Sequence, residues 1–120
     1  MMDFYVDDLL GKPYEEHGRG PDAYDCYGLV IEVERRLGKA LPDVVYQNHD
    51  LELSRKAATL PLARTERAER GSVIEIESKG ELHIGVALSP TVMIHSTYNK
   101  GVCVHPIKMF KIRGIYGLTI

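Results

Sequence analysis

The hydrophobic pattern of this 120-residue chain changes period once, and that change limits the fold more than any other feature. One segment shows the three- and four-residue spacing of an amphipathic helix, with apolar side chains at Cys26, Leu29, Val30, Val33 and Leu37. From Ser72 onward the spacing becomes two, which is typical of strands with one buried face. Helices first and strands later predict an α+β domain in which helices cover one face of a sheet.

Three helices are expected, and the central one has the clearest ends. Asp25 suits the N-cap of a helix over residues 26–37, and Gly38 suits its C-terminal cap. Two shorter helices are predicted, over residues 3–10 and 50–58. The segments expected to connect the elements without regular structure are residues 11–25 and 59–70.

Short strands are expected in the second half, because turn residues separate runs that alternate or are apolar. These runs cover residues 72–77, 82–88, 92–96, 101–106 and 113–119. Short turns between consecutive strands predict an antiparallel meander of about five strands, with the N-terminal helices packed on it. The whole chain, residues 1–120, is expected to form one domain, because its length suits a single core.

Composition excludes several classes of partner. The formal net charge of −2 offers no basic excess for a nucleic acid, and no run approaches the ~20 apolar residues of a membrane span. The two cysteines, Cys26 and Cys103, are expected to be free thiols, with Cys103 a packing residue on a strand. The first residues are acidic where a signal peptide would be basic, so we expect a protein that is cytoplasmic as synthesised.

Cys26 and two downstream histidines form the candidate catalytic set. Cys26 lies in the first turn of the expected helix, where the helix N-terminus and a nearby imidazolium favour the reactive thiolate. His83 and His95 lie on neighbouring predicted strands. If residues 89–91 form a three-residue loop, Gly85 opposes His95 and both histidines share one face within reach of each other. A two-residue loop would place them on opposite faces.

A thiol with two imidazoles suggests three chemical roles. Cys26 is the expected nucleophile, and His83 is the general base that later protonates the leaving amine. His95 orients His83 and stabilises its imidazolium. Each residue alone also fits a structural role, because a cysteine on the apolar face of a helix is usually a small core residue. A zinc site formed by the same three residues is a further alternative.

Four motifs, in order and spacing over residues 11–106, together resemble the NlpC family of papain-like cysteine peptidases. The first is Gly11-Lys12-Pro13-Tyr14, followed by Gly18 and by Asp25-Cys26-Tyr27-Gly28-Leu29-Val30. The other three are Arg70-Gly71-Ser72-Val73, His83-Ile84-Gly85-Val86 and Met93-Ile94-His95-Ser96-Thr97. Any one of these motifs is weak, whereas all four together are specific.

The resemblance implies a papain-like fold and hydrolysis of amide bonds in bacterial cell-wall stem peptides, most typically between D-glutamate and a diamino acid. It implies no cofactor and no metal. Tyr14 corresponds to the family tyrosine whose hydroxyl lies near the catalytic sulfur, and Asp25 to an aspartate that in some members helps to hold the amino end of the substrate. Tyr27 stands where the family usually has a serine lining a substrate subsite, so it bears on substrate choice.

Several biological settings are compatible with such a chain. Short members of this kind are encoded in phage tail gene clusters, which implies phage tail proteins as partners and the virion as a location, with peptidoglycan stem peptides or muropeptides as substrates. The alternatives are a cytosolic enzyme that recycles wall peptides, a domain of a larger secreted protein, and a non-catalytic binding or structural module with a papain-like cleft. Acyl transfer to or from lipids by a related thiol fold is disfavoured. In relatives of that kind the histidine precedes the cysteine in the chain, whereas here Cys26 precedes both histidines.

Overall fold

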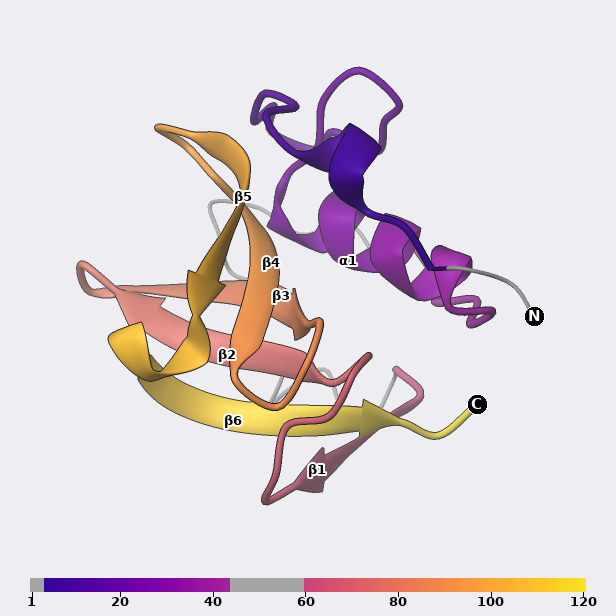
Figure 1. Ribbon diagram of the computed structural model, residues 1–120, viewed down its shortest axis with the longest axis vertical. Coiled ribbons are helices and arrows are strands. Elements are labelled where there is room, and N and C mark those ends of the chain that lie inside the picture. The colour runs from indigo at the N-terminus through magenta and orange to yellow at the C-terminus, as the bar shows by residue number, and fades with distance from the viewer. Residues whose placement is uncertain (1–3, 44–59) are drawn as a thin grey trace.

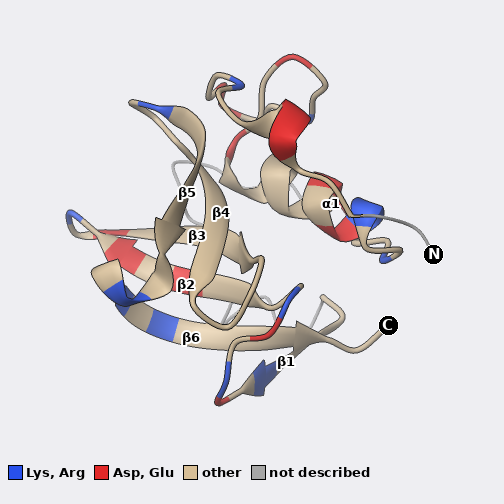
Figure 2. Cartoon of the chain, in the orientation of Figure 1, with Lys and Arg blue, Asp and Glu red and all other residues tan. Residues whose placement is uncertain are grey.

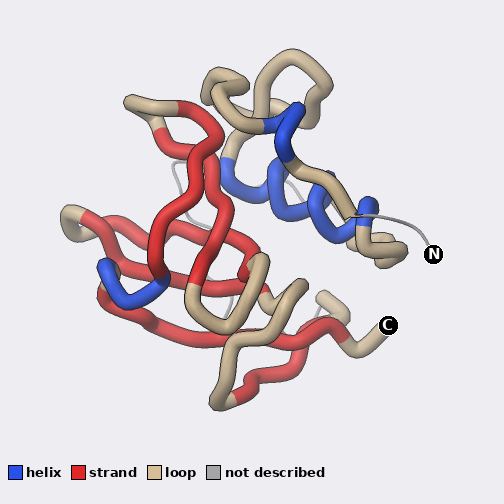
Figure 3. The backbone as a smooth tube through the Cα atoms, viewed as in Figure 1, coloured by secondary structure: helices blue, strands red, loops and turns tan. Residues whose placement is uncertain are grey.

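A computed structural model describes residues 4–43 and 60–120, so the helix expected over residues 50–58 lies outside the described residues. Within these ranges the chain folds into one layer of helix and loops beside one strongly curved sheet (Figures 1 and 3). The elements are η1 (Asp7–Leu9), α1 (Cys26–Arg36), β1 (Leu62–Thr65), β2 (Val73–Ser78), β3 (Glu81–Ala87), β4 (Val92–Thr97), β5 (Gly101–Pro106), η2 (Ile107–Met109) and β6 (Lys111–Leu118). No described helix is long and apolar enough to cross a membrane.

The sheet is antiparallel, with its strands in the order β1-β6-β2-β3-β4-β5. The predicted α+β class is confirmed, and β2 to β5 form the expected meander. Two details differ from the expectation. β6 does not follow β5 but returns to pair with β2, and β1 forms inside the segment expected to be a connector. β1 is an edge strand with three exposed residues out of four, so it lacks the alternation that identifies a strand in sequence.

Helix α1 has the ends that its sequence predicts. The Asp25 carboxylate accepts a hydrogen bond from the Gly28 N–H at 2.6 Å, which satisfies one free donor of the first turn. At the other end Gly38 has a φ of +84°, and its N–H and that of Lys39 donate to carbonyls of the last turn. The short helix expected over residues 3–10 is reduced to the single 3-10 turn η1.

The two faces of the sheet pack in different ways. One face carries the main core, in which the apolar stripe of α1 packs on side chains such as Ile84, Val86 and Ile94. The opposite face holds a smaller cluster of buried residues: Ile74, Ile76, Ala87, Met93 and Ile107. Since side chains alternate along a strand, His83 and His95 lie on this second face, in line with Ala87 and Met93.

The ladder between β3 and β4 is short, and the pocket described below lies beyond its end. The register pairs Val86 with Ile94 and Ala87 with Met93, and it does not continue toward His83. The Leu88 N–H donates to the Val92 carbonyl at 2.8 Å, so residues 89–91 form the three-residue loop on which the predicted register depended. Beyond the ladder, a pocket lined by residues of both strands opens toward the N-terminus of α1.

Candidate active site

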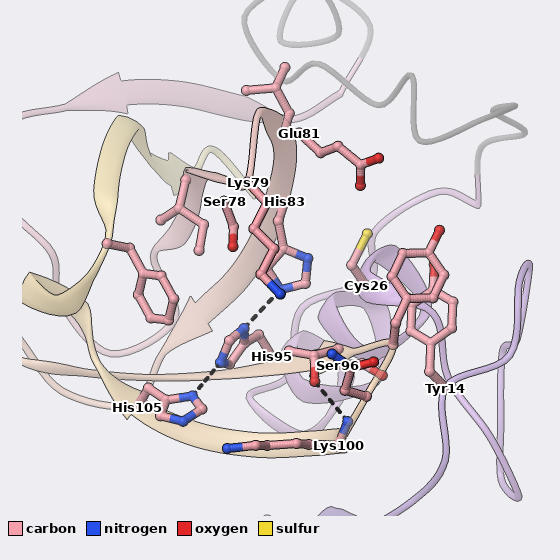
Figure 4. A pocket seen from close by; sticks show the side chains of 16 residues that line it. Tyr14, Cys26, Ser78, Lys79, Glu81, His83, His95, Ser96, Lys100 and His105 are labelled. Atoms are coloured by element: carbon pink, nitrogen blue, oxygen red, sulfur yellow. Dashed lines mark hydrogen bonds between the residues drawn. The ribbon is translucent and has the colours of Figure 1, made fainter.

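A pocket with a volume of about 260 Å³ lies where the first turn of α1 meets the ends of β3 and β4 (Figure 4). Four of the predicted site residues line it: Tyr14, Cys26, His83 and His95. Its rim carries charges of both signs, from Lys79, Glu81 and Lys100. Asp25 and Tyr27, the other two predicted site residues, are not among its lining residues.

Cys26 is the first residue of α1, so its sulfur lies at the positive end of the helix dipole. The side chain is only 8% exposed, yet it borders the pocket. Figure 4 shows Cys26 beside the ring of His83, on the side of that ring opposite His95. A thiol in this position has an electropositive environment on one side and an imidazole on the other, which is the arrangement that favours a thiolate.

The histidines form a continuous line across three neighbouring strands. His83 Nε2 of β3 lies 2.8 Å from His95 Nδ1 of β4, and His95 Nε2 lies 2.8 Å from His105 Nδ1 of β5. Gly85 makes the first contact possible, because a Cβ there would lie 2.9 Å from the Cβ of His95 and 2.7 Å from the Ile94 oxygen. Successive rings meet edge to face, with centroids 5.0 and 5.1 Å apart.

His95 is held in its neutral form. It is 2% exposed, and burial, followed by the neighbouring His83 and His105, lowers its pKa to about 3. Strands β4 and β5 carry no Lys, Arg, Asp or Glu (Figure 2), so no carboxylate on these strands offsets the burial. A neutral imidazole has one N–H and one acceptor nitrogen, so His95 can accept a hydrogen bond from His83 only while donating one to His105.

Tyr14 adds a neutral hydroxyl to the same pocket. Burial, followed by negative charge at Cys26 and Asp25, raises the pKa of Tyr14, so the phenol keeps its proton. Its ring packs against Tyr98, with centroids 4.4 Å apart. The hydroxyl is therefore a hydrogen-bond donor in the pocket that Cys26 also lines.

Asp25 and Tyr27 are engaged within the protein. The fully buried Asp25 carboxylate accepts from the N–H groups of Gly28 and His17 and pairs with Arg19 at 2.8 Å. The Tyr27 hydroxyl donates to the Pro42 carbonyl at 2.6 Å, and burial raises the pKa of Tyr27 to about 12. Both side chains hold loops against the start of α1, and their roles in substrate binding stay predictions.

Two residues at the site were not assigned a functional role from the sequence. His105 extends the line of histidines, and Cys103 Sγ lies 3.7 Å from both His95 Nε2 and His105 Nδ1. In the described part of the chain, the ligand cluster suited to a metal is therefore His95, Cys103 and His105, rather than the set with Cys26 considered above. The Cys-Val-His spacing of two on one strand was the available signal, because it places both side chains on one face.

The chain was compared with models of protein families and with solved structures. Residues 11–113 match the model of the NlpC/P60 family. The NlpC/p60 domain of the peptidoglycan hydrolase SagA is 19% identical, with a TM-score of 0.64 over 92% of this chain and 90% of that one. NlpC2 and NlpC1 from Trichomonas vaginalis are 18% and 19% identical, each with a TM-score of 0.60 over 91% of this chain. This chain spans 44% and 41% of those two, and no curated protein matches it.

Proposed function

Because the chain belongs to the NlpC/P60 family and is a cysteine peptidase, we propose that it hydrolyses amide bonds in the stem peptides of bacterial peptidoglycan, with Cys26 as its nucleophile. The observation that carries this proposal is the position of Cys26 at the start of α1, in one pocket with His83, whose far nitrogen lies 2.8 Å from His95. Family membership supports the class of reaction, and this geometry supports the choice of residues.

The reaction follows from that geometry in two steps. His83 takes the proton of the Cys26 thiol, and the thiolate attacks the carbonyl carbon of the scissile amide. Backbone N–H groups at the start of α1 stabilise the oxyanion, and His83 then protonates the departing amine, which leaves a thioester on Cys26. A water molecule that gives a proton to His83 hydrolyses the thioester, releases the carboxylate and restores the thiol.

His95 acts in this scheme by orienting the base. Its Nδ1 accepts a hydrogen bond from His83 Nε2–H, which directs the other nitrogen of His83 toward Cys26. Because burial keeps His95 neutral, it stabilises the His83 imidazolium without competing for the proton.

The bond that we propose as the target joins D-glutamate to a diamino acid of the stem peptide. Around that bond the substrate carries free carboxylates and, on the diamino acid, an ammonium group. The rim of the pocket offers matching charges, with Lys79 and Lys100 available to carboxylates and Glu81 available to an ammonium. The association with a phage tail stays a prediction.

The direct test is to incubate the purified chain with muropeptides and to identify new amino termini by mass spectrometry. We expect cleavage by the wild type and by Cys103→Ala, and none by Cys26→Ala. Equal cleavage by the wild type and Cys26→Ala would exclude the proposed nucleophile. No cleavage of any muropeptide by the wild type would exclude the proposed substrate.

Thiol reactivity separates the enzyme from a non-catalytic module that keeps the cleft. An activated Cys26 should be alkylated rapidly at pH 6, whereas Cys103, whose pKa is raised by burial, should react slowly. The two sites are distinguished by peptide mapping after short exposure to iodoacetamide. Two equally slow thiols would favour the binding module.

A further inference from the structure

Three side chains of types that bind metals meet on the far side of His95 from His83. His95 and Cys103 are direct partners in the register of β4 and β5, and His105 lies two residues further along β5. All three therefore project from the same face of the sheet. Their ligand atoms, His95 Nε2, Cys103 Sγ and His105 Nδ1, all lie within 4.8 Å of one another.

The spacing of these atoms is close to that of a tetrahedral zinc site. Zn–N distances of about 2.0–2.1 Å and a Zn–S distance of about 2.3 Å place two nitrogens about 3.3 Å apart, and a nitrogen and a sulfur about 3.6 Å apart. In this protein both sulfur–nitrogen distances are 3.7 Å and the nitrogen–nitrogen distance is 2.8 Å. A metal ion would therefore need only a small separation of the two imidazole rings.

The surroundings leave room for entry and for a fourth ligand. His105 lines the same pocket as Cys26, at the end away from α1, and Cys103 is only partly buried. Two imidazoles and one thiolate are the donors that zinc and its spectroscopic substitute cobalt(II) prefer, whereas Ca²⁺ and Mg²⁺ prefer oxygen. With three protein ligands, a water molecule from the pocket that His95 and His105 line would be the fourth ligand.

We propose that His95, Cys103 and His105 form a binding site for a divalent transition-metal cation such as Zn²⁺, and that its occupation switches off Cys26. The first half of this inference is independent of the catalytic assignment. The second half rests on the proposed function, because it requires His83 to be the base for Cys26.

The switch operates through the position of one proton on His95. In the proposed mechanism without a metal, His83 Nε2–H donates to His95 Nδ1 across the 2.8 Å contact. The one proton of neutral His95 is then on Nε2 and is donated to His105 Nδ1, so both hydrogen bonds run in one direction. A metal on His95 Nε2 leaves the single proton of this neutral ring on Nδ1. His95 then donates to His83 Nε2, and the direction of the bond between them is reversed.

That reversal removes the function of His83 as a base. When His83 takes the Cys26 proton, it becomes an imidazolium with a proton on both nitrogens. Its Nε2–H would then face the Nδ1–H of metal-bound His95. The two nitrogens are 2.8 Å apart, a distance that requires one of them to be a hydrogen-bond acceptor, so two donors repel each other there. Metal binding therefore opposes formation of the thiolate–imidazolium pair without any contact between the metal and Cys26.

Metal binding is tested first, with a readout that does not depend on activity. The Cys26→Ala variant of the 120-residue chain, in which Cys103 is the remaining thiol, is titrated with Co²⁺ and followed by absorption spectroscopy. We expect a thiolate-to-cobalt charge-transfer band and the intense visible bands of a four-coordinate site, at one Co²⁺ per chain. Adding Cys103→Ala should abolish the charge-transfer band, and adding His105→Gln should weaken cobalt binding by at least about tenfold. His17→Gln is the control for a histidine outside the cluster.

The coupling to catalysis is tested with Zn²⁺ inhibition of the wild type and of Cys103→Ala, each relative to its own metal-free rate of muropeptide cleavage. We expect Cys103→Ala to need at least about tenfold more Zn²⁺ for half-inhibition. Absence of the cobalt band in Cys26→Ala would overturn the site. A band with equal Zn²⁺ sensitivity of both enzymes would overturn the switch, because Zn²⁺ would then act on Cys26 itself. A band without cleavage by any form would leave the metal site standing and reject the proposed function.

Discussion

At the scale of single residues, burial decides the protonation of the groups on which the site depends. His95 remains neutral because it is buried between two other imidazoles, and Tyr14 keeps its phenolic proton for a similar reason. Their chemical states arise from what surrounds them in the folded chain.

Replacing His95 should separate its orienting role from a structural one. His95→Ala removes the acceptor for His83 Nε2–H, and we expect kcat/KM for muropeptide cleavage to fall on the order of 100-fold. His95→Asn offers an amide oxygen at a similar position and should recover part of that loss. The alkylation rate of Cys26 at pH 6 should follow the same order. Full activity of His95→Ala would contradict the orienting role.

Glu34 should make stability depend on pH. It is 1% exposed, its Oε2 has no hydrogen-bond partner, and burial raises its pKa from 4.5 to about 8. The unfolded chain releases this proton above about pH 4.5, but the folded chain keeps it until about pH 8, so stability should fall across that interval. The check is the free energy of unfolding in urea, measured at pH 5 and at pH 8.5. Its decrease over this interval should be smaller for Glu34→Gln than for the wild type, by on the order of 3 kcal/mol.

The exposed Glu66 supplies the control for this measurement. Glu66→Gln should keep the pH dependence of the wild type. If Glu34→Gln also kept that dependence, the decline in stability would have to come from other groups.

At the scale of elements, the site depends on how closely β3 approaches β4. The ladder between them is short, and Gly85 lies at its end, against Met93, Ile94 and His95. A side chain at this position would separate the strands at the point where His83 meets His95. The position of His83 relative to His95 therefore depends on the strand pair as well as on the two histidines.

Gly85→Ala should reduce activity and stability together. The added methyl would lie 2.6 Å from Met93 Cε and 2.7 Å from the Ile94 oxygen, and the backbone oxygen cannot move alone. We expect a loss of about 1–3 kcal/mol in urea unfolding, and loss of cleavage even where the variant remains folded. Gly117→Ala in β6 is the matched control, because its methyl would meet Thr65 at an ordinary 3.4 Å. Equal activity of both variants would argue against close approach as the requirement.

At the scale of the whole molecule, the site is assembled from two layers. Cys26 and Tyr14 belong to the N-terminal layer, and the histidines belong to the sheet (Figure 1). Backbone hydrogen bonds from Gly11 to Val102 and from Val102 to Lys12 join the layers at β5. A buried hydrogen bond from the Ser96 hydroxyl to the Tyr24 carbonyl, at 2.7 Å, joins them at β4.

Removing the Ser96 hydroxyl should therefore weaken the packing of the N-terminal layer against the sheet. Ser96→Ala leaves the Tyr24 carbonyl without this buried donor, and we expect a loss of about 1–3 kcal/mol in urea unfolding. Alkylation of Cys26 at pH 6 should also slow, because the thiol and His83 come from different layers. Ser89→Ala, in the loop between β3 and β4, should change neither measurement. Destabilisation with unaltered alkylation would show that other contacts position Cys26.

The local parts of this protein could be predicted from its sequence. Helical spacing and the caps Asp25 and Gly38 define α1, and the three-residue loop after β3 places His83 beside His95. These features depend on neighbouring residues, whose spacing and turn chemistry act over a few positions. The family motifs identified the class of enzyme for the same reason, because each is a short local pattern.

Only the tertiary structure decided which distant segments meet. The sequence pattern of β6 would be the same whether it paired with β5, as the last strand of a meander, or with β2, as it does. Its place in the sheet therefore depends on long-range pairing. Long-range packing also brings Cys103 and His105 next to His95. It likewise decides that the Tyr27 hydroxyl donates a hydrogen bond to the Pro42 carbonyl. Period and turn residues determine the elements, whereas contacts between elements depend on packing that no local pattern specifies.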